Sequence, residues 1–241
     1  MKILIIRHAD PDYSIDSITE KGKRERDLLT ERLKKENISA IYCSTLGRAR
    51  DTIQPTAEHF GITPVYCEWL REFEYPKISV PYLDRDKNAW DILPSYVDEN
   101  KQLYSPTDWK NVDFIKNSEV PSAYDNVIFE FDKVLANHGY SKSGAYYKAT
   151  DSNHSTIVFT CHFGLGALLV SHLFNASPYT FWQNSFFAPS SVTTFYTEER
   201  EEGIASFRCS AIGDVSHLYF GNEDSSFSGR FCECFTDDTR H

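Results

Sequence analysis

Short apolar runs and longer amphipathic stretches alternate along the chain. Apolar runs typical of buried parallel strands lie at residues 3–6, 38–43, 63–67 and 157–161. Capped or amphipathic stretches predict helices at 20–37, 48–60, 124–135 and 165–174, the second interrupted at Pro55. Two further strand-like runs cover 192–196 and 206–212. This alternation predicts an α/β fold, a three-layer sandwich in which helices flank a mostly parallel central sheet.

Three segments depart from this pattern. Residues 75–120 scatter prolines among aromatic side chains, which predicts a cap segment inserted over one edge of the sheet. Residues 141–155 read as a polar loop, and residues 221–241 as a polar C-terminal tail. No internal repeat is visible, so we expect a single domain spanning residues 1–241.

Composition and charge exclude several classes of protein. Of the 241 residues 41% are hydrophobic, and the net charge of −10 argues against nucleic-acid or anionic-membrane partners. The first apolar run ends at Arg7 and His8, so we expect no leader, no membrane span and a cytoplasmic location. The six cysteines form no CxxC pair, and an isolated Cys232-Glu233-Cys234 is only weak evidence for metal binding. We therefore expect reduced, buried thiols, no structural metal and no cofactor.

Polar residues suited to one kind of chemistry follow the predicted strands. Arg7 and His8 come directly after the first strand, Arg48 opens the helix after the second, Glu72 follows the third and His162 follows 157–161. Ligands of open α/β sheets bind at the carboxyl ends of the strands. The planar guanidinium group binds two phosphate oxygens at once, and a histidine held among such donors can act as a nucleophile. Taken alone, each residue has an ordinary structural interpretation, but their joint placement favours a phosphoryl-transfer site.

Six short motifs carry a resemblance to a known family. They are Arg7-His8-Ala9, Ile18-Thr19-Glu20-Lys21-Gly22, the run from Ser44 to Thr52, Leu70-Arg71-Glu72, Cys161-His162-Phe163-Gly164 and the run from Gly213 to Leu218. In these residues and their order the chain resembles the phosphatase-type branch of the histidine phosphatases, also called the phosphoglycerate mutase-like superfamily. Two positions depart from the family pattern. Ala9-Asp10 replaces the usual Gly-Glu, and Phe163 separates the second histidine from its glycine.

The resemblance implies a role for each site residue. His8 would attack phosphorus and form a phosphohistidine, while Arg7, Arg48 and His162 would hold the phosphoryl oxygens. Glu72 would protonate the leaving alcohol. For that role Glu74 is the fallback, and Ser14 stands where the family often has a polar contact to the phosphate.

The resulting hypothesis is a metal-independent phosphomonoester hydrolase. Its substrate would be a small-molecule or protein phosphoester; the alternatives are a phosphoglycerate mutase and a non-catalytic member that only binds phosphorylated ligands. The stretch 76–119 has a net charge of −2, which disfavours substrates that carry several further anionic groups. It therefore favours a phosphatase over a mutase. We expect the aromatic residues of this stretch to fold the cap rather than stack on a ligand. A homodimer is compatible with the sequence.

Overall fold

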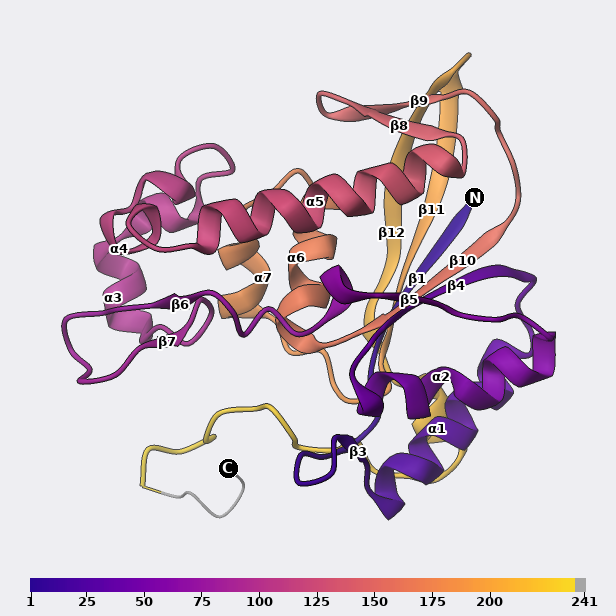
Figure 1. Cartoon of the computed structure of the whole chain (residues 1–241), viewed down its shortest axis with the longest axis horizontal. Coiled ribbons are helices and arrows are strands. Elements are labelled where there is room, and N and C mark those ends of the chain that lie inside the picture. The colour runs from indigo at the N-terminus through magenta and orange to yellow at the C-terminus, as the bar shows by residue number, and fades with distance from the viewer. Residues whose placement is uncertain (237–241) are drawn as a thin grey trace.

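The computed structural model describes residues 1–236 and confirms the α/β sandwich. Its central sheet has eight strands in the order β5-β4-β10-β1-β11-β12-β9-β8 (Figure 1). Parallel pairs join β1 (Lys2–Arg7), β10 (Thr156–Cys161), β4 (Ile38–Ser44) and β5 (Val65–Cys67). Antiparallel pairs extend the sheet through β11 (Val192–Glu201), β12 (Ile204–Asp214), β9 (Tyr146–Ala149) and β8 (Tyr140–Ser143).

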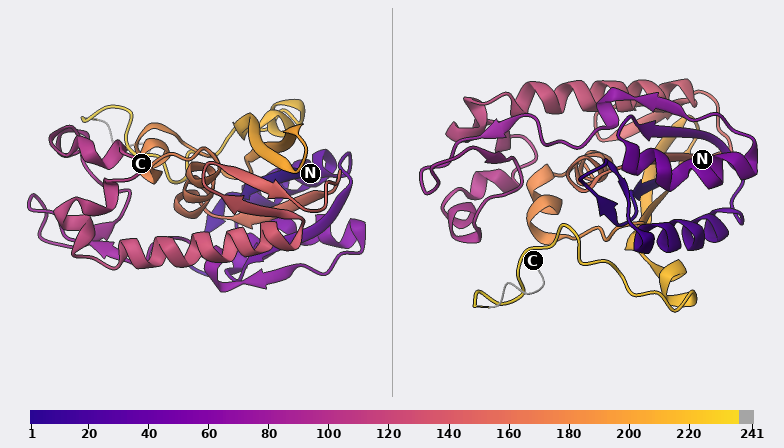
Figure 2. Two further views of the ribbon diagram at one scale, coloured as in Figure 1. Left: turned by 90° about the horizontal axis from the view of Figure 1, so that it is seen from above. Right: turned by 60° about the horizontal axis from the view of Figure 1, so that its bottom comes forward.

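Helices cover both faces of the sheet (Figure 2). One face carries α1 (Glu20–Leu33) and α2 (Gly47–Phe60), with α8 (Ser216–Phe220) against α1. The other carries α5 (Val120–Asn137), α6 (Phe163–Leu173) and α7 (Pro178–Asn184). Successive residues of β1 point to opposite faces: Ile3 and Ile5 join the core under α5 and α6, and Leu4 and Ile6 join the core under α1 and α2. Because both faces are covered, the four residues from Ile3 to Ile6 are all apolar.

The first two helices show how local sequence sets their ends. The Thr19 hydroxyl accepts a hydrogen bond from the Gly22 amide at 3.0 Å, so α1 begins where the capping residue predicts. The interruption predicted at Pro55 is wrong, because α2 runs unbroken through the proline to Phe60. A proline removes only one helix hydrogen bond. Ile53 and Ala57, buried on either side of it, keep the helix packed on the sheet.

The cap segment shares the core of the face that α5 covers. It contains β6 (Lys77–Ile78), β7 (Lys87–Asn88), α3 (Pro94–Glu99), 3-10 turns at Lys101–Tyr104 and Trp109–Asn111, and α4 (Asp113–Lys116). Trp109 is buried, with its ring edge-on to Tyr124 of α5 and Tyr179 of α7. This tryptophan therefore folds the cap onto the helices.

The stretch predicted as a polar loop contains a strand pair. β8 and β9 form a hairpin, and β9 pairs with β12 at Ile204 and Ala205. Tyr140 and Tyr147 are buried against Phe207, so two aromatic side chains anchor a hairpin that the surrounding serines and lysines conceal in the sequence.

The cysteines are only partly as predicted. All six are free; Cys43, Cys67 and Cys161 are buried, and Cys209 is half-buried. The expectation of burial is wrong for Cys232 and Cys234, which lie exposed in the tail, where no core surrounds them. No helix within residues 1–236 is long and apolar enough to cross a membrane.

The tail returns toward the carboxyl ends of the parallel strands. Its described part, residues 221–236, follows α8 and runs back beside α1 and the hairpin of β2 (Pro11–Asp12) and β3 (Ser17–Ile18) (Figure 1). Residues 237–241 of the predicted tail lie outside the described residues.

Helix α1 buries an acidic side chain near this edge. Glu25 is fully buried, and its Oε2 accepts a hydrogen bond from the Asp10 amide at 2.8 Å. The other oxygen lies 3.7 Å from Lys21 Nζ, beyond hydrogen-bond distance. Burial raises the pKa of Glu25 from its usual 4.5 to about 7.

We expect Glu25→Gln to stabilise the protein above pH 7. The folded pKa exceeds the unfolded one, so the protonated carboxyl stabilises the fold below pH 4.5, and that stability is lost as the pH rises to about 7. A neutral amide removes this loss, which predicts a gain of roughly 2 kcal/mol in unfolding free energy at pH 8 and little at pH 4.5. Urea unfolding at the two pH values measures it, with exposed Glu31→Gln on the same helix as the control. An equal effect at both pH values would contradict a buried Glu25 carboxyl with a raised pKa.

Candidate active site

The parallel register brings the predicted residues together at one edge of the sheet. Arg7 lies beside Cys161, and Thr160 beside Cys43, so the residues that follow β1, β10 and β4 meet. The His8 amide donates to the Cys161 carbonyl at 2.9 Å, and the rings of His8 and His162 have centroids 5.1 Å apart. Two histidines from segments far apart in the sequence thus face each other across neighbouring strands.

His8 is held as a neutral ring. It is 2% exposed, and its Nδ1 lies 2.7 Å from the Ala9 carbonyl oxygen. A carbonyl can only accept, so Nδ1 carries the proton and Nε2 keeps its lone pair. Burial first, and then the charge of Arg7, hold the pKa of His8 well below its usual 6.5. The ring is therefore unprotonated at Nε2 at neutral pH, as a nucleophile must be.

Arg7 is buried next to His8 and fixed by main-chain oxygens. Its Nη1 donates to the Phe187 carbonyl at 2.6 Å, and its Nη2 donates to the Ser228 carbonyl at 3.1 Å. Its Nε has no hydrogen-bond partner within residues 1–236. A buried donor without a partner is costly, and an anion would satisfy it.

Arg48 projects from the first turn of α2 and is also buried. Its Nη1 donates to Asp16 Oδ1 at 2.6 Å, while Asp16 Oδ2 accepts from the Gly47 amide at 2.7 Å. Only glycine permits this approach, since a Cβ at position 47 would lie 2.0 Å from the Asp16 carbonyl oxygen. Among the described residues nothing accepts from Arg48 Nε. As in Arg7, part of the guanidinium is held by the protein and part is unused.

His162 precedes α6 and is fully buried. Its Nε2 lies 2.8 Å from the Ser44 hydroxyl, which also accepts from the Leu46 amide at 3.3 Å. Its Nδ1 has no partner in the part of the chain that the structure describes. Burial, followed by His8 and Arg48, lowers the pKa of His162 well below 6.5.

Glu72 lies on the N-terminus of α6. Its Oε1 accepts from the amides of Phe73 at 2.8 Å and Leu165 at 3.1 Å, and its Oε2 accepts from the Gly164 amide at 3.3 Å. Burial raises the pKa of Glu72, which these hydrogen bonds and the charge of Arg7 partly oppose. The amides at the start of α6 bind Glu72, and no such contact is seen for Glu74 within residues 1–236. Of the two candidate acids, Glu72 is therefore the one that lies next to the segment of His162.

Ser14 lies in a different setting. It is exposed, and its hydroxyl donates to Asp12 at 2.6 Å. Among the described residues, no hydrogen bond joins Ser14 to Arg7, His8, Arg48 or His162, so its assignment still rests on the resemblance alone.

Several partners of the site escaped the sequence analysis. Ser44 stands inside one of the quoted motifs, although its hydrogen bond to His162 depends on the strand register. Asp16 carries no signal beyond its charge, and the carbonyls of Phe187 and Ser228 carry none.

Within residues 1–236, no group of three or more His, Cys, Asp or Glu side chains could hold a metal ion.

Comparison with known sequences finds a family match in the N-terminal part of the chain. Residues 3–94 match the sequence profile of the histidine phosphatase superfamily (branch 1). A relative from Schizosaccharomyces pombe, described as a probable phosphatase, is 25% identical over 231 residues, which cover 90% of this chain and 95% of the relative.

Solved structures share the fold over most of the chain. Phosphoserine phosphatase from Entamoeba histolytica, in complex with 3-phosphoglyceric acid, has a TM-score of 0.56 and 17% identity, covering 90% of this chain and 98% of that one. YhfR of Bacillus stearothermophilus has a TM-score of 0.58 and 20% identity with the same coverage. A mycobacterial glucosyl-3-phosphoglycerate phosphatase has a TM-score of 0.55 and 17% identity, covering 88% of this chain and 98% of that one. The chain therefore matches the histidine phosphatase profile over residues 3–94 and shares the fold of these solved structures over most of its length.

Proposed function

We propose that this protein hydrolyses phosphomonoesters through a phosphohistidine on His8, without a metal ion. The observation that carries the proposal is a set of three buried nitrogens that have no hydrogen-bond partner within residues 1–236: Nε of Arg7, Nε of Arg48 and Nδ1 of His162. They belong to the side chains around His8, whose Nε2 keeps its lone pair. The rings of His8 and His162 have centroids 5.1 Å apart, and burial, together with the charges of both arginines, lowers the pKa of both rings. Such fixed donors match the negative charge that spreads over phosphoryl oxygens in the transition state.

The serine contact of His162 sets which nitrogen faces the phosphate. Ser44 Oγ accepts from the Leu46 amide, so its own hydrogen is free to be donated to His162 Nε2. The ring proton then lies on Nδ1, which becomes a donor toward the phosphoryl oxygens. In this arrangement a neutral His162 stabilises the anion without having to gain a proton.

In the first step, His8 Nε2 attacks phosphorus while the bond from phosphorus to the leaving oxygen breaks. Glu72 gives its proton to that oxygen, and the alcohol departs. Its Oε1 already accepts two amide hydrogens, so the proton belongs on Oε2. The raised pKa favours the protonated form that a general acid needs.

In the second step, water attacks the phosphohistidine. The Glu72 carboxylate takes a proton from the water, the P–N bond breaks and its electron pair returns to His8 Nε2. Phosphate leaves, and both side chains regain their starting protonation states. One carboxyl thus serves as acid and then as base.

The names of the relatives suggest phosphoesters of modest size. The pombe relative is described as a phosphatase, and two neighbours are named as phosphatases of phosphoserine and of glucosyl-3-phosphoglycerate. The net charge of −2 over residues 76–119 favours a monoester without several further anionic groups. Hydrolysis is therefore favoured over a mutase reaction.

We expect the purified protein to release free phosphate from p-nitrophenyl phosphate in excess EDTA. Its guanidinium groups occupy the role that metal ions play elsewhere, so chelation should change the rate less than about twofold, whereas vanadate should inhibit. A malachite-green assay measures the product. Activity that is lost in EDTA and restored by Mg²⁺ or Zn²⁺ would contradict the proposal. Interconversion of 2- and 3-phosphoglycerate without net phosphate release would indicate a mutase.

A trapping experiment should distinguish the roles of His8 and His162. His8→Ala should abolish turnover and the acid-labile ³²P label that rapid quenching captures on the protein. His162→Ala should slow labelling by about 100-fold or more, since it removes one donor to the phosphoryl group but leaves the nucleophile. His59→Ala, at the exposed end of α2, serves as the control. Label on any residue other than His8 would show that the nucleophile has been misassigned.

Glu72→Gln should discriminate between leaving groups. We expect a loss of about 100-fold or more in kcat/KM for alkyl phosphates and less than about tenfold for p-nitrophenyl phosphate, whose phenolate needs little protonation. Glu74→Gln is the matched control, two residues along the same segment. An equal loss on both substrates, or a larger effect from the control, would remove Glu72 from the proton transfer.

A further inference from the structure

The C-terminal tail touches the arginine that is proposed to bind phosphate. The Ser228 carbonyl accepts from Arg7 Nη2 at 3.1 Å. Gly229 follows with a φ of +83°, and a Cβ there would lie 2.6 Å from the same nitrogen. A segment more than 200 residues away in sequence therefore packs directly on the guanidinium group.

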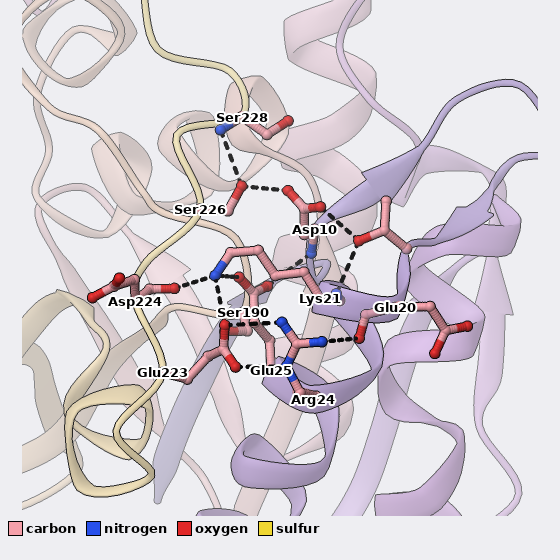
Figure 3. A network of polar contacts seen from close by, with 12 residues as sticks. Asp10, Glu20, Lys21, Arg24, Glu25, Ser190, Glu223, Asp224, Ser226 and Ser228 are labelled. Carbon is pink, nitrogen blue, oxygen red and sulfur yellow. Dashed lines mark hydrogen bonds and ion pairs between the residues drawn. The ribbon is translucent and has the colours of Figure 1, made fainter. Parts of the chain in front are cut away.

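A cluster of charges on α1 fastens the tail in this place (Figure 3). The Glu223 carboxylate accepts from Arg24 Nε at 2.7 Å and from Lys21 Nζ at 2.9 Å. Lys21 also donates to the Asp224 carbonyl. We call Lys21, Arg24 and Glu223 the clasp. The two cations hold the pKa of Glu223 down to about 2, so the clasp stays charged over the pH range of an assay.

A second attachment lies closer to the nucleophile. The buried Ser226 hydroxyl donates to Asp10, two residues after His8, and accepts from the Ser228 amide at 3.1 Å. Asp10 is itself tied to α1, because its amide donates to Glu25 and its carboxylate accepts from Thr19 at 2.6 Å. The contacts therefore run without a break from the clasp through Ser226 to Ser228, whose carbonyl accepts from Arg7.

We infer that residues 223–229 form a strap that closes the phosphate site and positions Arg7, with the clasp as its fastening. The inference rests on the proposed function. Two carbonyls, of Phe187 and Ser228, fix the plane of the guanidinium and leave Nε for the phosphoryl group. With the strap in place Arg7 is only 4% exposed and His8 2%, so substrate reaches them when the strap lifts. Ion pairs with exposed partners are individually weak, which suits a fastening that opens in every catalytic cycle.

The test uses the full chain with one reversed charge. Glu223→Lys breaks the clasp, Glu223→Asp keeps its charge, and Glu198→Lys reverses a carboxylate that pairs with Arg208 on the β11–β12 hairpin. Release of the strap is followed as chymotrypsin cleavage after Phe227, mapped by mass spectrometry. Site closure is followed as the Kd for inorganic phosphate and as KM and kcat for p-nitrophenyl phosphate.

We expect cleavage after Phe227 to be about fivefold faster in Glu223→Lys than in Glu198→Lys, and phosphate to slow it in the unmodified chain. The Kd for phosphate and KM should rise about fivefold or more, because Arg7 loses one orienting hydrogen bond, while kcat changes less. Glu223→Asp should recover most of both effects. Cleavage and phosphate binding do not depend on turnover, so they test the strap even if no phosphoester proves to be a substrate.

Two results would overturn the strap. One is faster cleavage in Glu223→Lys with phosphate affinity and KM equal to those of Glu198→Lys, which would make the tail a bystander. The other is increased kcat/KM in Glu223→Lys, which would make the tail an obstruction rather than a positioning element. Equal cleavage in all variants, with and without phosphate, contradicts the fastening itself.

Discussion

The burial of positive charge at one edge of the sheet is the constraint on which the rest of the site depends. Arg7 and Arg48 lie beneath the surface where water cannot solvate them, and burying an ionised group is costly unless other groups pair with it. The protein offsets part of this cost with the Asp16 carboxylate and with the carbonyls of Phe187 and Ser228. These partners engage the terminal nitrogens of each guanidinium and leave both Nε groups unpaired among the described residues. The arrangement suits an anion that completes the set.

The same constraint fixes the state of the histidines. Two buried rings whose centroids lie 5.1 Å apart, beside two cations, cannot readily take up protons, so both pKa values fall. Neutral rings are what a nucleophile at His8 and a hydrogen-bond donor at His162 require. Glu72 responds in the opposite direction, because burial disfavours its charged form and raises its pKa. In the proposed mechanism, a single buried environment thus keeps the histidines unprotonated and favours a protonated Glu72.

Much of the fold and the centre of the site could be predicted from the sequence because local patterns determine them. The run from Ile3 to Ile6 must be a strand covered on both faces, and the residue after a parallel strand must lie at the ligand edge. The hairpin of β8 and β9 was missed because the buried Tyr140 and Tyr147 are spaced among polar residues. The continuity of α2 through Pro55 depends on packing that a local rule does not include.

The supports of the site were harder to foresee for a different reason. Asp16 meets Arg48 only because the loop before α1 folds over the start of α2, and Ser228 meets Arg7 only because the tail returns across the molecule. Glu25 looks like any charged residue of a surface helix until its burial is seen. Contacts of this kind depend on tertiary structure, and no spacing in the sequence encodes them.

A crystal structure of the full chain with vanadate tests the central claim most directly, because vanadate adopts the five-coordinate geometry of the reacting phosphorus. The account predicts vanadium bonded to His8 Nε2, with the oxygens accepting hydrogen bonds from Nε of Arg7, Nε of Arg48 and Nδ1 of His162. Vanadate bound elsewhere, or bonded to a different side chain while these nitrogens stay unpaired, would contradict it.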